Sequence, residues 1–183
     1  MDIHRAVRQI EEELEELFAR ADLGAADRLL DGLVAARRVY VAGEGRSGLV
    51  GRAFAMRLIH LGMHSFVCGE TITPAIEAGD LCIACSGSGE TPITCHRARR
   101  SREVGATVAA ITAAPGSRLA AEADIEVVLP APTTPSSASP SEQFGASLFE
   151  QSLLLFLDAM VLLLQEHRGA SPESMSAKHA NLE

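Results

Sequence analysis

Short apolar runs alternate with helix-forming stretches along the middle of the chain, and this alternation limits the possible folds more than any other feature. Buried strands are expected where β-branched and small apolar residues cluster, at residues 39–42, 65–68, 80–85, 107–111 and 125–129. Helices are expected between them, at residues 49–61, 91–104 and 117–123. Strands joined through helices need right-handed crossovers, which build a parallel sheet covered on both faces. The pattern therefore predicts an α/β fold: a three-layer α/β/α sandwich with a five-stranded parallel sheet, of the flavodoxin-like type.

The segments on either side of this core complete a single domain over residues 1–183. A chain of 183 residues, of which 47% are hydrophobic, is long enough to bury one core and too short for two. Helices are expected at 3–18 and 25–34, before the core at 37–130, and a long apolar helix is expected at 142–167. The proline-rich segment 130–140 is expected to be a polar loop, and residues 168–183 a tail with little apolar content.

The first helix and the late helix are both expected to make subunit contacts. Residues 153–164 are apolar on nearly all sides, more than one sheet face can cover, which favours burial in a homo-oligomer. The stretch is interrupted by Asp158 and is shorter than the roughly 20 apolar residues that span a bilayer, so no membrane contact is expected. Residues 1–20 carry five glutamates and lack a signal-peptide pattern, which predicts a cytoplasmic protein.

Charge and cysteine usage exclude two classes of site. The net charge of −8 and the absence of a basic run with interleaved aromatics argue against nucleic acid as a partner. A small anion can still bind locally at backbone N–H groups of a helix start. Cys82 and Cys85 have the CxxC spacing, but on a strand two residues three apart point to opposite faces. We therefore expect structural thiols and no metal.

The strongest chemical signal is a loop rich in serine and glycine that follows a strand and opens a helix. It reads Ser86-Gly87-Ser88-Gly89-Glu90-Thr91. In open α/β sheets, ligands bind beyond the carboxyl ends of the strands, where such a turn offers backbone N–H groups and a helix dipole to an anion. The hydroxyl groups add donors without adding charge, so the loop is expected to bind a phosphate group. The alternative is that its hydroxyls only cap the following helix.

A second glycine-rich turn follows the first expected strand. It reads Gly43-Glu44-Gly45-Arg46-Ser47-Gly48. Its third glycine comes one residue too early for a dinucleotide fingerprint, so no nucleotide cofactor is expected. Gly45 and Ser47 are expected to line the same crevice as the serine-rich loop. Arg46 is equally compatible with a substrate contact and with a structural ion pair.

These two turns, together with three further segments, resemble the sugar isomerase (SIS) domain family and, within it, the 6-phospho-3-hexuloisomerases of the ribulose monophosphate route of formaldehyde fixation. The further segments are Met56-Arg57-Leu58-Ile59-His60-Leu61-Gly62, Phe149-Glu150-Gln151 and Met175-Ser176-Ala177-Lys178-His179-Ala180-Asn181-Leu182-Glu183. The resemblance covers nearly the whole chain. It implies interconversion of a 3-hexulose 6-phosphate and fructose 6-phosphate by a tetramer, without a metal or an organic cofactor. Glu44 departs from the pattern, which has a small residue there; its carboxylate is expected to point away from the phosphate or to pair with Arg46.

Such an isomerisation needs a base that moves a proton between two neighbouring carbons through an enediol. Glu150 is the first candidate, because it lies at the polar start of an otherwise apolar helix and in the matching Phe-Glu-Gln context. The alternative is a capping box with Ser147. Lys178 and His179 are expected to dock near a neighbouring subunit's site as part of a lid, against the alternative of a frayed tail.

Each of the remaining candidates is compatible with more than one role. His60 is a secondary catalytic candidate, since a lone histidine among apolar helix residues is more often a core or interface histidine. Glu90 and Thr91 are expected either to orient substrate hydroxyl groups or to cap their helix. Two other functions stay open: an SIS isomerase acting on a pentose or heptose phosphate, and a non-catalytic regulator that binds a sugar phosphate.

Overall fold

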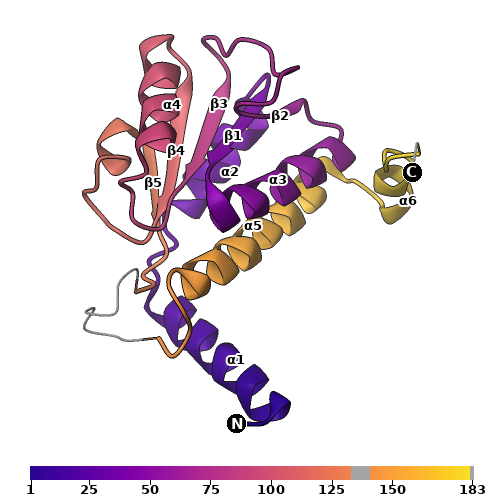
Figure 1. Cartoon of the computed structure of the whole chain (residues 1–183). Helices are drawn as coiled ribbons and strands as arrows, with labels where there is room; N and C mark the ends of the chain where they lie inside the picture. Colours follow the sequence, from indigo (N-terminus) through magenta and orange to yellow (C-terminus); the bar gives the residue numbers. More distant parts are fainter. Residues whose placement is uncertain (133–140, 182–183) are drawn as a thin grey trace.

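A five-stranded parallel sheet forms the centre of the molecule. The computed structural model describes residues 1–132 and 141–181, so most of the expected loop at 130–140 and the last two residues, Leu182 and Glu183, lie outside the described residues. The strands follow the order β2-β1-β3-β4-β5 (Figure 1). They are β1 (Val39–Gly43), β2 (Ser65–Val67), β3 (Leu81–Cys85), β4 (Thr107–Thr112) and β5 (Ile125–Val128). The predicted sheet is therefore confirmed, and the carboxyl ends of its strands share one edge.

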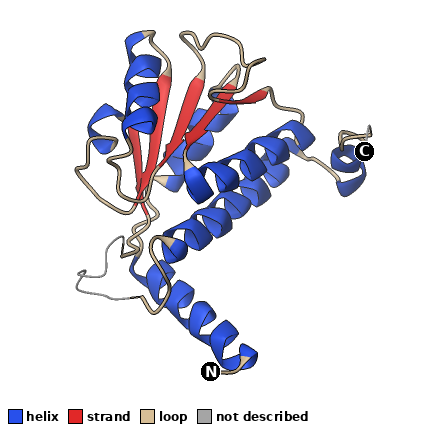
Figure 2. Cartoon of the chain, in the orientation of Figure 1, coloured by secondary structure: helices blue, strands red, loops and turns tan. Residues whose placement is uncertain are grey.

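Helices cover both faces of the sheet, which confirms the three-layer sandwich (Figure 2). One face carries the larger core, to which α2 (Ala26–Ala35), α3 (Gly45–His60) and α5 (Ser147–Arg168) contribute. The other face is covered by α4 (Pro92–Glu103) and the short 3₁₀ helix η1 (Ala120–Glu122) over small side chains. Cys85 belongs to the first cluster and Cys82 to the second, so the two thiols point to opposite faces as predicted.

Several apolar side chains on helices α1 (Ile3–Arg20), α3 and α5 remain exposed. Helix α1 projects away from the body beside the start of α5 (Figure 1). The exposed apolar residues of α1, α3 and α5 are Ile3, Val7, Leu49, Met56, Ile59, Leu154, Leu155, Leu162 and Leu163. Among the described residues, α5 is the one helix long and apolar enough to cross a membrane, a test that buried core helices also pass; half of its most apolar window is buried here.

Helices α3 and α5 start four or more residues away from their predicted positions. Helix α5 begins at Ser147, five residues later than expected, because Gly145 has a positive φ of 63° and the segment before it is bound by α1. There Glu13 accepts hydrogen bonds from the Ser141 hydroxyl at 2.5 Å and the Glu142 amide at 3.1 Å. Helix α3 begins at Gly45, four residues earlier than expected, so the second glycine-rich turn forms its first turn.

The C-terminal tail is more ordered than its composition predicted. It contains helix α6 (Pro172–Ser176), which begins with a capping box between Ser171 and Ser174. Met175 is partly buried against the main core. The tail therefore docks onto its own chain, near the end of α3.

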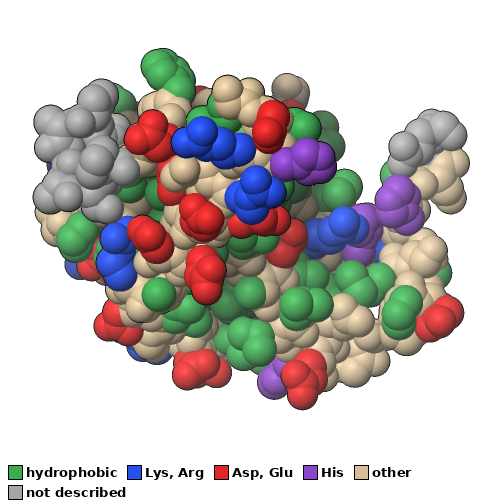
Figure 3. Space-filling view, turned by 90° about the horizontal axis from the view of Figure 1, so that it is seen from below, with side chains coloured by type: hydrophobic (Ala, Val, Ile, Leu, Met, Phe, Trp, Pro, Cys, Tyr) green, Lys and Arg blue, Asp and Glu red, His purple; other side chains and the backbone are tan. Residues whose placement is uncertain are grey.

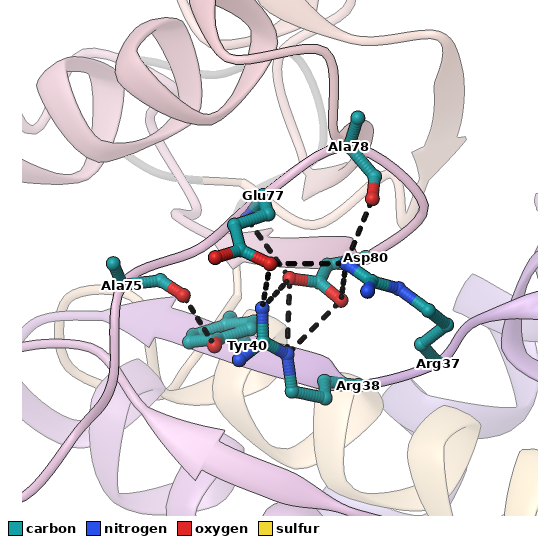
Figure 4. Close-up of polar contacts among 7 residues, drawn as sticks. All are labelled: Arg37, Arg38, Tyr40, Ala75, Glu77, Ala78 and Asp80. Carbon is teal, nitrogen blue, oxygen red and sulfur yellow. Dashed lines mark hydrogen bonds and ion pairs between the residues drawn. The ribbon is translucent and has the colours of Figure 1, made fainter.

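A buried carboxylate is bound by two arginines at the edge of the sheet where the strands begin, opposite to their carboxyl ends (Figure 4). The side chain of Asp80 is fully buried just before β3, and it accepts hydrogen bonds from Arg38 Nη2 at 2.7 Å and Nε at 3.1 Å. Arg37 and the Glu77 amide approach the same carboxylate at 3.4 and 2.9 Å. Burial opposes ionisation, but these hydrogen bonds and positive charges outweigh it, so the pKa of Asp80 is lowered.

Candidate active site

The serine-rich loop lies at the carboxyl edge of the sheet, between β3 and α4. The hydroxyl groups of Ser86 and Thr91 are 2.9 Å apart, and the Ser86 hydroxyl also accepts a hydrogen bond from the Gly89 amide at 3.2 Å. Thr91 is the N-cap of α4, yet its side chain makes no capping hydrogen bond. Capping is therefore not the role of Thr91, and the positive end of the α4 dipole faces the loop.

The end of β4 holds this loop in shape. Gly87 O accepts from the Ala113 amide at 3.0 Å and from the Thr112 hydroxyl at 3.3 Å. Gly89 has φ +65°, and a Cβ atom there would meet Ser117 Oγ at 2.0 Å. Only glycine fits at this position, because both the backbone conformation and the space exclude a side chain. A loop fixed in this way can present its donors to an anion without reorganising.

Glu90 leaves the loop to contact a neighbouring segment. Its Oε1 atom accepts a hydrogen bond from the Arg118 amide at 3.0 Å, just before η1. Ser88 is exposed, and its hydroxyl accepts from the Glu90 amide at 3.2 Å. The role of Glu90 as an orienting group for substrate hydroxyls stays a prediction.

The first turn of α3 stands beside the serine-rich loop. Gly43 pairs with Cys85, so Glu44 and Ser86 leave the sheet from neighbouring strands. A Cβ atom on Gly48 would lie 2.6 Å from Gly43 O, so glycine here lets the helix begin directly on the strand end. Ser47 is buried, and the N-cap of α3, Glu44, makes no capping hydrogen bond with its side chain. The uncapped N-termini of α3 and α4 thus converge on one edge, as an anion site requires.

Glu150 lies within the same region, on the first turn of α5. A Cβ atom on Gly87 would lie 3.0 Å from the ring of Phe149, so the serine-rich loop rests on the residue before Glu150. The Glu150 side chain is 13% exposed, and its Oε2 atom lies 2.6 Å from Arg46 Nε. The capping-box alternative is wrong, because the N-cap is Ala146 and the Ser147 hydroxyl donates to Phe144 O. Of the two roles open to Arg46, the structure shows the ion pair.

Glu44 pairs with a residue that nothing in the sequence had singled out. Its Oε1 atom lies 2.6 Å from Nη1 of Arg97 on α4, so the expected pair with Arg46 is wrong. Both residues line a cavity of about 320 Å³ that also includes Gly45 but none of the serine-rich loop. The remaining lining residues are Gly43, Gly48, Leu49, Arg52, Cys68 and Gly69. Gly45 therefore opens toward this neighbouring cavity.

Three other candidates gather at the far end of α3. His60 is buried, and its ring stacks on that of His179 with centroids 5.0 Å apart. Burial lowers the pKa of His60, and the charges of His179 and Arg57 lower it further. Lys178 lies over Gly62, where a Cβ atom would be 3.0 Å from its Nζ. Figure 3 shows histidine and basic side chains side by side where the C-terminal segment meets the body.

One chain does not bring these three residues to the serine-rich loop. Helix α3 has 16 residues, so its ends are about 24 Å apart. Helix α5 runs beside it in the same direction, since Arg46 contacts its start and Leu61 O accepts from Arg168 Nε at its end. Within a single chain, His60, Lys178 and His179 therefore lie at the opposite end of the helix pair from Glu150. The described residues contain no group of three or more His, Cys, Asp or Glu side chains placed to hold a metal ion.

Known proteins are similar to this chain over most of its length. The SIS domain matches residues 32–164. A Bacillus subtilis protein named 3-hexulose-6-phosphate isomerase is 41% identical over 97% of both chains, and one of the same name from Mycobacterium gastri is 40% identical over 100% of this chain and 92% of its own. A solved Methanococcus jannaschii structure, for which that function was inferred, is 29% identical with a TM-score of 0.83, covering 98% of this chain and 99% of its own. These matches confirm the resemblance, and the chain belongs to the SIS domain family.

Proposed function

We propose that this chain interconverts 3-hexulose 6-phosphate and fructose 6-phosphate. Two full-length relatives named 3-hexulose-6-phosphate isomerase support the substrate, and the family supports a sugar phosphate as ligand. One structural observation carries the proposal: the serine-rich loop rests on Phe149, and the next residue, Glu150, presents a carboxylate. A phosphate bound by the loop would hold the sugar beside a group able to move a proton.

In the proposed reaction, Glu150 removes the proton from carbon 2 of the 3-hexulose and the carbonyl at carbon 3 becomes an enediol oxygen. A proton passes from the hydroxyl oxygen on carbon 2 to the oxygen on carbon 3, the protonated Glu150 returns its proton to carbon 3, and the carbonyl forms at carbon 2, so the atoms balance within the substrate. The ion pair with Arg46 must open for this step. The substrate phosphate offers Arg46 a second anion, so binding would free the Glu150 carboxylate when a substrate is present.

A second copy of the chain would supply the three residues that one chain keeps at a distance from Glu150. His60, Lys178 and His179 would then lie near the phosphate or the enediolate of a neighbouring subunit, where the Lys178 ammonium and the histidine N–H groups could donate hydrogen bonds to the negative charge of the transition state. The exposed apolar residues of α1, α3 and α5 support such contacts. We accordingly propose a homotetramer, built from pairs that share sites, in the cytoplasm.

Subunit complementation tests the shared site. Glu150→Gln and His60→Gln should each be inactive alone, but co-expressed they should recover roughly a quarter of wild-type activity, because half of the pairs are mixed and each has one intact site. Differently tagged chains, purified sequentially, verify that mixed pairs form. Mixed pairs that stay inactive would show that both residues must come from one chain.

The reaction itself is tested by supplying 3-hexulose 6-phosphate and coupling fructose 6-phosphate formation to a dehydrogenase that gives a spectrophotometric signal. Steady turnover is expected without added metal. Pentose and heptose phosphates serve as competing substrates, and a higher kcat/KM for one of them would replace the proposed substrate. Tight binding of fructose 6-phosphate without turnover would instead favour a regulator.

A further inference from the structure

The Glu44–Arg97 pair is the feature of this edge that the proposed reaction does not use. Glu44 is the N-cap of α3, but its carboxylate makes no capping hydrogen bond and reaches across to α4 instead. Glu44 directly follows β1 and Ser86 directly follows β3, and because Gly43 and Cys85 are paired neighbours, a negative charge stands beside the start of the serine-rich loop. A carboxylate in this position opposes the binding of a phosphate dianion unless another charge offsets it.

Arg97 is held where it can supply that charge. Its side chain is 23% exposed, and its Nη1 atom lies 2.6 Å from Glu44 Oε1. The guanidinium also packs over Gly69, where a Cβ atom would lie 2.6 Å from Nη2. Gly69 has φ +97°, so both the backbone and the space favour glycine beneath the arginine. The cation is therefore fixed by α4, the turn after β2 and the start of α3 together.

We propose that Arg97 is a positioning residue that masks the charge of Glu44, so that the adjacent loop can bind the phosphate group of the substrate. The proposal rests on the phosphate site of the proposed function. The pair acts as one neutral unit, so Arg97 is needed only because Glu44 is present. A carboxylate left unpaired near a bound dianion at a partly exposed site weakens its binding by roughly tenfold.

The test is a double-substitution cycle with binding as the main readout. Dissociation constants for inorganic phosphate and fructose 6-phosphate are measured by calorimetry for wild type, Arg97→Met, Glu44→Gln and the double variant, at low and at high salt. Arg97→Met should weaken binding of both ligands by roughly tenfold at low salt and by much less at high salt, since salt screens exposed charges. Glu44→Gln should bind at least as tightly as wild type. The double variant should return to within about twofold of wild type.

Arg100→Met is the matched control, since it removes the same charge from an exposed position on α4 and should leave binding unchanged. In turnover assays Arg97→Met should raise KM with little change in kcat.

A double variant that binds as weakly as Arg97→Met would overturn the proposal, because Arg97 would then bind the ligand or hold the loop itself. Unchanged affinity in Arg97→Met, or no phosphate binding by wild type, would overturn it too. If the wild-type protein binds these ligands but does not turn over 3-hexulose 6-phosphate, the proposed reaction is refuted. The proposed role of Arg97 is then still tested, because the double-substitution cycle measures binding and not turnover.

Discussion

Glu150→Gln is expected to lower kcat by about 10³-fold and to leave the affinity for fructose 6-phosphate within about threefold of wild type. A glutamine keeps the shape of the side chain and can still accept a hydrogen bond from Arg46, but it cannot accept a proton from carbon 2. The serine-rich loop is held in place by the ends of β3 and β4 and by the ring of Phe149, and the substitution changes none of them. Turnover in the coupled assay and calorimetric binding of fructose 6-phosphate measure the two quantities separately.

Glu166→Gln is the matched control for this substitution. It removes a carboxylate from the exposed end of the same helix, and its kcat should equal that of wild type. If Glu150→Gln kept kcat within threefold of wild type, another residue would be the base. If it lost affinity and rate together, Glu150 would bind the substrate instead of moving its proton.

Asp80→Asn is expected to lower the free energy of unfolding by about 2 to 3 kcal/mol, or the melting temperature by about 5 to 10 °C. The substitution leaves Arg38 facing a buried neutral amide, and removing one partner of a buried pair costs more than the pair itself contributes. The side chain of Arg38 is 23% exposed, so water offsets part of the lost interaction. Urea unfolding at a fixed protein concentration measures the change, because assembly also affects stability.

The stability difference between wild type and Asp80→Asn should depend on pH. The pKa of Asp80 in the folded protein is lowered, so its ionised form is favoured by folding. The contribution of ionised Asp80 to the free energy of unfolding is fully present above about pH 4, which is near the ordinary pKa of an aspartate in an unfolded chain. It is lost as the pH falls through the lowered pKa of the folded state. The difference in free energy of unfolding between wild type and Asp80→Asn should therefore be smaller at pH 3 than at pH 7.

Glu77→Gln is the control for the Asp80 substitution, because Glu77 pairs with the same two arginines while its side chain is 60% exposed. An exposed pair contributes at most about 1 kcal/mol, so this change should be small. Equal losses for the two variants, or a gap that does not change between pH 7 and pH 3, would contradict the assignment of a buried, ionised Asp80.

The parts of the molecule that local sequence determines were predictable, and those that depend on distant pairs were not. The strands follow from runs of apolar residues, and the serine-rich loop from its place between a strand and a helix. The partner of Glu44 lies 53 residues away, and nothing in the spacing of the arginines on α4 distinguishes Arg97. The late start of α5 likewise depends on Glu13, which lies 128 residues from Ser141. Helix α6 was missed because its five residues are too few to show a periodic pattern.

The contact between Gly87 and the ring of Phe149 has a consequence for the length of the substrate. It joins the loop that would hold the phosphate to the helix that carries Glu150, so the separation between the two is set inside one chain. A ketose 6-phosphate has four carbon–carbon bonds between carbon 2 and the phosphate-bearing carbon, and a ketose 5-phosphate has three. This contact would therefore select substrates by the number of carbons between the reacting carbon and the phosphate. A larger residue in place of Gly87 would change the chain length that is preferred.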